Sequence, residues 1–207
     1  MNCPLCSAKS TFYTKDKKRS YQQCLNCDLV FVPDEFILSE EKEKAEYDFH
    51  ENDPQDPGYR KFLSRIFDPI SELAKPPAKG LDFGCGPGPA LYQMFEEAGY
   101  KMSLYDPYYF PDKEPLSSTY DFITSTEVIE HVRNPDKVFD LLFEMLSING
   151  TLGLMTKMVL SKEAFQNWHY KNDPTHIRFY SRKTFDLVAE KYSRKAQFIG
   201  NDVILFI

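Results

Sequence analysis

The chain has 207 residues, enough for one sizeable hydrophobic core with a small additional unit. Its apolar fraction of 42% is that of a globular protein, no run is long enough to span a membrane, and no secretory signal opens the sequence, so we expect a cytoplasmic protein with no membrane partner. The formal net charge is −6, whereas nucleic-acid-binding domains usually have a basic face, so nucleic acid is disfavoured as a partner.

Four of the five cysteines form two C-x2-C pairs near the start of the chain. Cys3 and Cys6 in CPLC are separated by 17 residues from Cys24 and Cys27 in CLNC. Two such pairs predict a tetrahedral Zn2+ site, and four thiolates leave no position for water, so the metal would be structural. Two disulfides are the alternative, but nothing else indicates an oxidising compartment. A hairpin between the pairs completes a predicted zinc ribbon over residues 1–33.

Two charged segments lie within and directly after the predicted ribbon, a basic hairpin tip and an acidic stretch. The tip at residues 15–19 is expected to be a solvated loop, with phosphate contact as the alternative. The acidic segment 34–57 is predicted to be a linker. If it folds back, it would instead form a lid with His50, Asn52 and Tyr59, and both interpretations stay open.

From residue 58 onward, strand and helix patterns alternate to the end of the chain. Strands are predicted at 79–84, 100–106, 120–126 and 150–156, helices at 59–75, 89–98, 136–146 and 181–191, and a hairpin at 196–207. The first helix would have Phe62, Ile66, Ile70 and Leu73 on one face and a kink at Pro69. This alternation predicts a mostly parallel sheet covered on both faces, in a domain spanning 58–207.

Three glycines separate the first strand of this domain from its helix. Gly84, Gly86 and Gly88 in LDFGCGPG let the backbone approach a ligand at the helix N-terminus. Pro89 stands where a dinucleotide-binding fingerprint has its last glycine, and no Gly-Lys-Ser/Thr follows as in a P-loop. Both of these nucleotide-binding motifs are therefore disfavoured.

Two carboxylates complete a different pattern. Asp106 ends the next strand, where it can accept hydrogen bonds from the hydroxyls of a ribose. Asp82 precedes the glycines, and its charge suits an ammonium group. An adenosine that carries an amino-acid tail is S-adenosylmethionine.

With LYD and YDFITSTEVIEHV, these motifs resemble the class I S-adenosylmethionine-dependent methyltransferases over about residues 60–207. The resemblance implies a Rossmann-like α/β sheet of seven strands that ends in an antiparallel hairpin. The residues assigned to the cofactor are Asp82, Gly84, Cys85, Gly86, Gly88, Tyr105, Asp106, Pro107, Thr126 and Glu127. The whole chain resembles a bacterial subgroup with an N-terminal zinc ribbon, whose neighbours are implicated in methylating sugars or other small molecules.

One segment departs from the family pattern. Only 13 residues separate Asp106 from Tyr120, where the family has a helix, a strand and an adenine-contacting loop. The third strand is therefore predicted to be short or absent. Tyr108, Tyr109 and Phe110 either stack on adenine or fill the gap in the core.

The segment NWHYKNDPTHIRFY is the richest candidate for the methyl-acceptor site. It lies in a crossover that we expect over the carboxyl ends of the strands. Trp168 and Tyr170 could wall a small acceptor, and His176 with Asp173 could form a base and its orienting partner. The alternative is that Asp173 and His176 cap a turn. His131 is a further candidate base, or a residue that fixes its own loop.

The acceptor chemistry is narrowed by exclusion. STEVIEHV lacks the Asp/Asn-Pro-Pro-aromatic element of enzymes that methylate the exocyclic amines of bases. Methylation of cytosine C5 needs a nucleophilic cysteine, but Cys85, the only cysteine outside the predicted zinc site, lies in the glycine turn. We therefore expect methyl transfer to oxygen, nitrogen or carbon of a sugar or metabolite. A non-catalytic zinc-ribbon scaffold protein with a degenerate fold and an RNA methyltransferase remain the alternatives.

Overall fold

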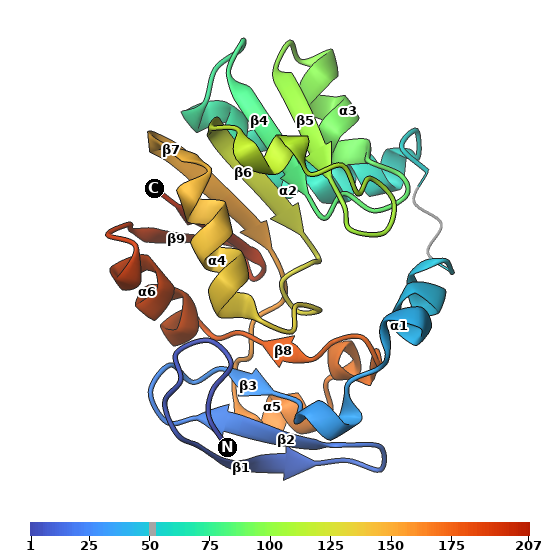
Figure 1. Cartoon of the computed structure of the whole chain (residues 1–207), viewed down its shortest axis with the longest axis vertical. Coiled ribbons are helices and arrows are strands. Elements are labelled where there is room, and N and C mark those ends of the chain that lie inside the picture. Colours follow the sequence, from blue (N-terminus) through green and yellow to red (C-terminus); the bar gives the residue numbers. More distant parts are fainter. Residues whose placement is uncertain (50–52) are drawn as a thin grey trace.

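A six-stranded sheet occupies one half of the molecule in the computed structural model, which describes residues 1–49 and 53–207 (Figure 1). Its half contains α2 Pro57–Leu73, β4 Lys79–Phe83, α3 Ala90–Glu97, β5 Lys101–Tyr105, η2 Glu114–Ser117, β6 Tyr120–Thr126, α4 Pro135–Glu144, β7 Leu146–Met155, α6 Arg182–Lys191, β9 Ala196–Ile199 and β10 Val203–Phe206. The strand order is β5-β4-β6-β7-β10-β9. Strands β5, β4, β6 and β7 are parallel, and β10 is antiparallel to both β7 and β9.

This architecture confirms the Rossmann-like α/β sheet and the terminal hairpin that the sequence predicts. Within the described residues, the connection from β5 to β6 contains the single-turn helix η2 and no strand of the larger sheet. The third strand of the family pattern is therefore absent, as expected from the short spacing.

Helix α2 covers one face of this sheet and continues through Pro69. Its buried residues are Leu63, Ile66 and Ile70, at the three- and four-residue spacing of one helical face. The apolar face predicted from the sequence is buried at its centre and less so at its ends. Phe62 is half-buried, and Leu73, the last helical residue, is 50% exposed.

A second, smaller sheet forms the other half of the molecule. Strands β1 Ser10–Lys15, β2 Ser20–Cys24, β3 Val30–Phe31 and β8 Arg178–Phe179 pair antiparallel in the order β1-β2-β3-β8. The first three belong to the ribbon, whereas β8 belongs to the crossover that also contains α5 Lys162–Gln166 and the 3-10 turn η3 His169–Asn172. The division at residues 33 and 57 stays a prediction, but the ribbon sheet is completed by a strand from the C-terminal part.

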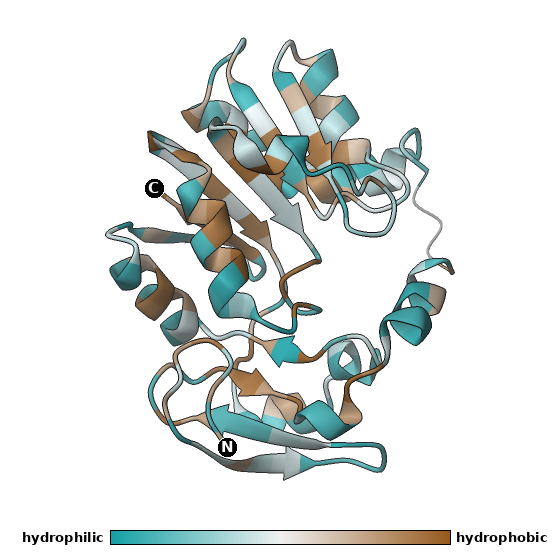
Figure 2. Ribbon diagram, viewed as in Figure 1, coloured by the Kyte–Doolittle hydropathy of each residue, from teal (hydrophilic) through white to brown (hydrophobic). Residues whose placement is uncertain are grey.

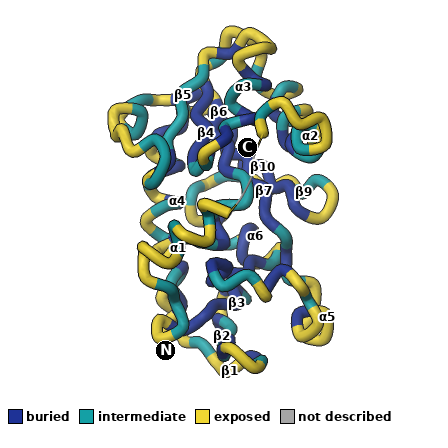
Figure 3. The backbone as a smooth tube through the Cα atoms, turned by 90° about the vertical axis from the view of Figure 1, so that its right-hand side faces the viewer, coloured by how far each residue is buried: buried dark blue, intermediate teal, exposed yellow. Residues whose placement is uncertain are grey.

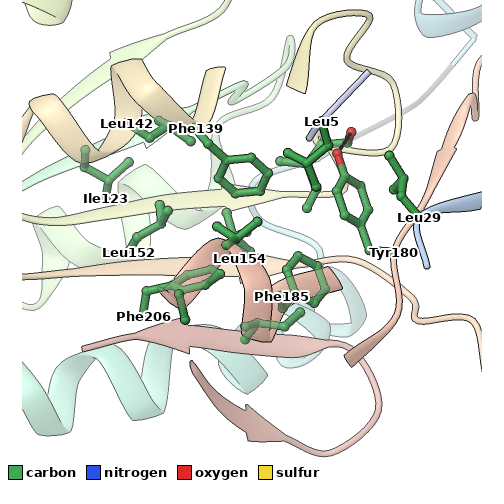
Figure 4. Close-up of a cluster of buried hydrophobic side chains, with 14 of the residues drawn as sticks. Leu5, Leu29, Ile123, Phe139, Leu142, Leu152, Leu154, Tyr180, Phe185 and Phe206 are labelled. Atoms are coloured by element: carbon green, nitrogen blue, oxygen red, sulfur yellow. Dashed lines mark hydrogen bonds between the residues drawn. The ribbon is translucent and has the colours of Figure 1, made fainter. Parts of the chain in front are cut away.

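The ribbon and the larger sheet share one hydrophobic core. Leu5 and Leu29 of the ribbon lie in the same cluster as Tyr180, Phe139 and Leu154 (Figure 4). Strand β3 of the ribbon sheet and the end of β7 in the larger sheet are hydrophobic in Figure 2 and buried in Figure 3. The ribbon is therefore fixed against the larger sheet by apolar packing.

The acidic segment contains the 3-10 turn η1 Asp34–Phe36 and helix α1 Glu40–Tyr47. Helix α1 has no buried residue and runs along one side of the molecule, between the ribbon half and the half with the larger sheet (Figure 1). Among the described residues, no helix combines the length and the hydrophobicity that crossing a membrane requires.

Candidate functional site

A cleft of about 440 Å³ opens at the carboxyl ends of β4, β5 and β6. Ligands of open α/β sheets bind at this edge. Five of the residues that the sequence assigns to a cofactor line it, namely Gly84, Tyr105, Asp106, Pro107 and Glu127. The other five, Asp82, Cys85, Gly86, Gly88 and Thr126, lie outside its lining.

The glycine turn requires glycine for steric reasons. Gly84 has φ +76°, and a Cβ atom there would lie 2.5 Å from the Val128 side chain. Gly86 also has a positive φ of 65°. Residues with side chains rarely adopt this conformation, so the turn can bring bare backbone to the wall of the cleft.

Asp106 ties the glycine turn to the loop after β5. One of its carboxylate oxygens accepts a hydrogen bond from the Gly86 amide at 3.0 Å, and the other accepts from the Tyr108 and Tyr109 amides at 2.9 and 3.1 Å. The residue is buried but lines the cleft. Its carboxylate therefore holds the glycine turn against the loop after β5, and together they form one wall of the cleft.

Asp82 lies beneath the turn, with 2% of its surface exposed. Its carboxylate accepts a hydrogen bond from the Thr124 hydroxyl at 3.2 Å. Burial raises the pKa of Asp82 to about 7, because the charged form is poorly solvated there. Its predicted contact with an ammonium group stays a prediction.

Helix α1 lines the cleft through Glu40, Glu43 and Tyr47, and its role as a linker or a lid stays a prediction. Tyr47 meets the rings of His131 and Tyr108 at centroid distances of 5.3 and 5.8 Å. The Tyr109 hydroxyl donates to Asp48 at 2.8 Å. Predicted lid residues His50 and Asn52 lie outside the described residues, and Tyr59 stacks on Phe62 at 6.2 Å within α2.

The three aromatic residues after β5 differ in whether they line the cleft. Tyr108 and Tyr109 line the cleft, with the Tyr47 ring 5.8 Å from Tyr108 and Lys44 5.2 Å from the Tyr109 ring. Phe110 exchanges two backbone hydrogen bonds with Asp106 and is not part of the lining.

The structure brings together the three predicted catalytic residues from two distant segments. The rings of His131 and His176 lie 4.7 Å apart, and the Asp173 carboxylate lies 3.8 Å from Nε2 of His176. His131 lines the cleft, whereas His176 is buried behind it.

Asp173 also behaves as the turn-capping alternative expects. Its Oδ1 accepts from both the amide and the hydroxyl of Thr175. Burial would raise the pKa of Asp173, but the Thr175 hydrogen bonds and the nearby His176 lower it.

Sequence analysis missed Glu130, which is fully buried beside these residues. The Tyr170 hydroxyl donates to Glu130 and lies 3.3 Å from Glu127. Burial raises the pKa of Glu127 to about 7 and, with repulsion from Glu127, raises the pKa of Glu130 to about 8. The spacing of EVIEHV, directly after a strand, is the signal that could have identified it.

Two expectations for the crossover and the hairpin tip need correction. Trp168 does not line the cleft but packs on Tyr170 and Phe179 at 5.0 and 6.1 Å. Arg19 is not a solvated tip residue, because it is buried and donates to the carbonyl oxygens of Lys171, Asp173 and Pro174. The side chains of Lys15, Lys17 and Lys18 are exposed, as expected.

The four ribbon cysteines form a compact cluster. Sulfur atoms of Cys3 and Cys27 lie 3.7 Å apart, those of Cys6 and Cys24 lie 3.4 Å apart, and all four lie within 4.8 Å of one another. A tetrahedral zinc site with bonds of about 2.3 Å has sulfur atoms about 3.8 Å apart. Backbone amides of Leu5, Asn26 and Cys27 point at these sulfurs from 3.4 Å. The geometry fits a zinc ion, and no cysteine of the described residues forms a disulfide.

Comparisons with known proteins agree with this geometry. A family model described as a methyltransferase domain matches residues 55–192. An O-methyltransferase family protein from Burkholderia thailandensis is 12% identical, with a TM-score of 0.54 over 83% of this chain, and the chain spans 60% of that protein's length.

Two further structures show the same fold. A protein described as a methyltransferase from Bacillus halodurans is 19% identical, with a TM-score of 0.53 over 66% of this chain and 67% of the other. A chain from the complex of the Trm112 methyltransferase activator with a methyltransferase of Haloferax volcanii is 9% identical, with a TM-score of 0.53 over 81% and 96%. No curated protein sequence matches the chain.

Proposed function

Because the chain belongs to the methyltransferase domain family, we propose that it transfers the methyl group of S-adenosylmethionine to a small-molecule acceptor. The family match confirms the enzyme class predicted from the sequence. The observation that carries the proposal is the cleft at the carboxyl edge of the sheet, which places the glycine turn and Asp106 in one wall and Glu127 with His131 in another.

The cofactor would occupy the wall formed by the turn and the loop after β5. Gly84 presents backbone to the cleft, Asp106 presents a carboxylate for the ribose, and Tyr108 and Tyr109 present aromatic faces for adenine. Glu127 lies at the end of β6, where the methyl group would be. Methyl transfer depends chiefly on correct alignment of the cofactor with the acceptor. The volume of the cleft is in the range of small-molecule sites, so it can hold part of each of them.

The acceptor would enter between helix α1 and the loop that carries His131. Glu40, Glu43 and Arg133 line this part of the cleft, and Arg133 lies 3.8 Å from Glu43, so one acidic charge remains unpaired by it and does not favour a nucleic-acid backbone. His131, and His176 with Asp173 behind it, supply candidate bases for an acceptor that must lose a proton.

Zinc is proposed for the ribbon on its cysteine geometry. Four thiolates would complete the ion's coordination, so its role would be to fold the ribbon and take no part in methyl transfer. Metal analysis of reduced protein should find one zinc per chain bound to this cluster.

The proposal is tested by calorimetric titration with S-adenosylmethionine and with S-adenosylhomocysteine. We expect micromolar binding, about −8 kcal/mol, for the wild type. Asp106→Asn should weaken this binding at least about tenfold, because the side chain proposed to bind the ribose loses its negative charge. Asp112→Asn is the matched control, since Asp112 is an exposed carboxylate of the same loop.

Two results would contradict the proposal. Absence of binding by either compound would favour the non-catalytic scaffold protein. Equal affinities in the wild type and Asp106→Asn would remove Asp106 from the cofactor site.

A further inference from the structure

Three side chains from two segments converge behind the cleft. Glu130 and His131 follow β6, and His176 lies in the crossover just before β8. Each offers one ligand atom, and these atoms all lie within 4.8 Å of one another. A carboxylate and two imidazoles at this separation can reach a single cation.

The Glu130 carboxylate is only half satisfied. The side chain is fully buried, and its Oε1 accepts from the Tyr170 hydroxyl. Its Oε2 is buried without a hydrogen-bond partner among the described residues. An unpaired buried carboxylate oxygen is costly, and a bound cation would remove that cost.

Both imidazoles are oriented by backbone carbonyls on one side. Nδ1 of His176 lies 2.7 Å from the carbonyl oxygen of Tyr170, and Nδ1 of His131 lies 3.2 Å from that of Thr175. A neutral ring that donates from Nδ1 to a carbonyl oxygen has its lone pair on Nε2. Metal-binding histidines are commonly fixed by such a carbonyl. Nε2 of His176 also lies 3.8 Å from the Asp173 carboxylate.

We propose that Glu130, His131 and His176 bind a divalent transition-metal cation beside the cleft. Two nitrogens and one carboxylate oxygen suit Mn2+, Fe2+, Co2+ or Zn2+, whereas Mg2+ prefers oxygen ligands. Three protein ligands leave coordination positions for water or an acceptor oxygen. Because His131 lines the cleft, the cation lies next to the space proposed for the acceptor.

The proposed site has imidazole and carboxylate ligands, whereas the cysteine cluster has thiolates. Metal binding at the two sites can therefore be measured separately, with Zn2+ for the thiolates and Mn2+ for the proposed site. Protein is dialysed against a chelator, given one equivalent of Zn2+ for the thiolates, and titrated with Mn2+ while the free ion is measured by electron paramagnetic resonance. We expect one bound Mn2+ per chain. Glu130→Gln and His176→Asn should each weaken Mn2+ binding at least about tenfold.

Matched variants separate loss of a ligand from loss of the fold. His169→Asn changes an exposed histidine of the same crossover and should bind Mn2+ as the wild type does. His131→Asn changes a half-buried ligand, so it should keep the melting temperature of the wild type and still lose Mn2+. Circular dichroism measures folding of every variant.

The proposal is overturned if the zinc-loaded wild type binds neither Mn2+ nor Co2+, or if folded Glu130→Gln and His131→Asn bind them as tightly as the wild type. Neither result bears on the proposed function, because S-adenosylmethionine binding is measured separately. Cofactor binding without this cation would reject only the second metal site, and Mn2+ binding without cofactor would reject only the proposed function.

Discussion

The two sides of the cleft are built in different ways. The side proposed for the cofactor comes from the ends of three neighbouring strands, within residues 84–128. Hydrogen bonds from backbone amides to the Asp106 carboxylate connect its segments. The side proposed for the acceptor is lined by helix α1 and the loop that carries His131. Behind that loop lies the crossover at residues 162–180, which contributes β8 to the ribbon sheet and receives three hydrogen bonds from Arg19. The first side is self-contained, whereas the second depends on a separate unit of the chain.

This difference gives the ribbon a role beyond that of its proposed zinc site. The crossover carries Tyr170, Asp173 and His176, and its turns are held by buried contacts to the ribbon rather than to the larger sheet alone. Lys171 is buried and forms an ion pair with Asp16 of the hairpin at 3.0 Å. The ribbon therefore positions the acceptor side, and disturbing it should affect the two sides unequally.

The largest effect is expected from loss of a ribbon cysteine. Cys27→Ser removes a buried thiolate, and structural zinc contributes about 10–16 kcal/mol to folding of zinc peptides, comparable to the stability of a whole domain. We expect loss of the zinc and disorder of the crossover. The single tryptophan, Trp168, packs in this region, so its fluorescence reports unfolding of the acceptor side.

The control for this variant is Cys85→Ser, which changes a buried cysteine of the glycine turn and should keep the zinc. Cys27→Ser protein that retains native Trp168 fluorescence and a wild-type melting temperature would show that the ribbon does not support the crossover.

The same difference explains what the sequence could predict. The cofactor side is encoded by neighbouring residues, so LDFGCGPG predicted a glycine turn between a strand and a helix, and LYD predicted Asp106 at the end of the next strand. The hydrogen bond that joins Asp106 to the turn was not predicted. Its missing strand could be predicted because 13 residues are too few for a helix and a strand. Burial of Arg19 could not be, because its partners lie more than 150 residues away.

The acceptor side was predicted only in part for the same reason. His131, Asp173 and His176 were each chosen for their chemistry, but nothing local indicates that a loop after β6 meets a crossover 45 residues later. Glu130 was not predicted because its burial results from the contact between the loop after β6 and the crossover. The position of Trp168 likewise follows from its contact with the ribbon core.

The next largest effect concerns Asp82, under the cofactor side. Its pKa is raised from 3.8 to about 7 by burial, so the folded state favours the neutral carboxyl. The contribution of Asp82 to the free energy of unfolding is therefore fully present below pH 4 and is lost as the pH rises from 4 through 7. The loss is up to about 4 kcal/mol. Asp82→Asn does not titrate, so its free energy of unfolding should rise relative to the wild type between pH 4 and pH 8.

Chemical unfolding of both proteins across this pH range measures the difference. Parallel pH profiles for the wild type and Asp82→Asn would show that Asp82 is ionised in the folded protein at pH 4 and above. Trp168 fluorescence should respond less than far-ultraviolet circular dichroism near the midpoint if the effect is centred on the larger sheet.

A smaller effect is expected from Arg19→Met, which acts on the acceptor side alone. The substitution keeps the apolar volume but leaves carbonyl oxygens of Lys171, Asp173 and Pro174 without their charged donor. We expect a loss of about 2–3 kcal/mol in stability and weaker Mn2+ binding at His176, with unchanged affinity for S-adenosylmethionine. Exposed Lys17 provides the control, Lys17→Met. Equal losses of cofactor and Mn2+ affinity in Arg19→Met would mean that the two sides are not independent.

The smallest effect is expected where the two sides meet, at helix α1. The Tyr109 hydroxyl donates to Asp48, and Lys44 lies 5.2 Å above the Tyr109 ring, so Tyr109→Phe removes one exposed hydrogen bond and keeps the ring contact. If α1 acts as a lid, this change should speed cofactor dissociation by about threefold in stopped-flow measurements. Tyr108→Phe is the control, because Tyr108 meets Tyr47 through its ring. Dissociation that is equally fast in the wild type and both variants would mean that α1 covers the cleft without gating it, and the two sides would then be joined only through the larger sheet and the shared core.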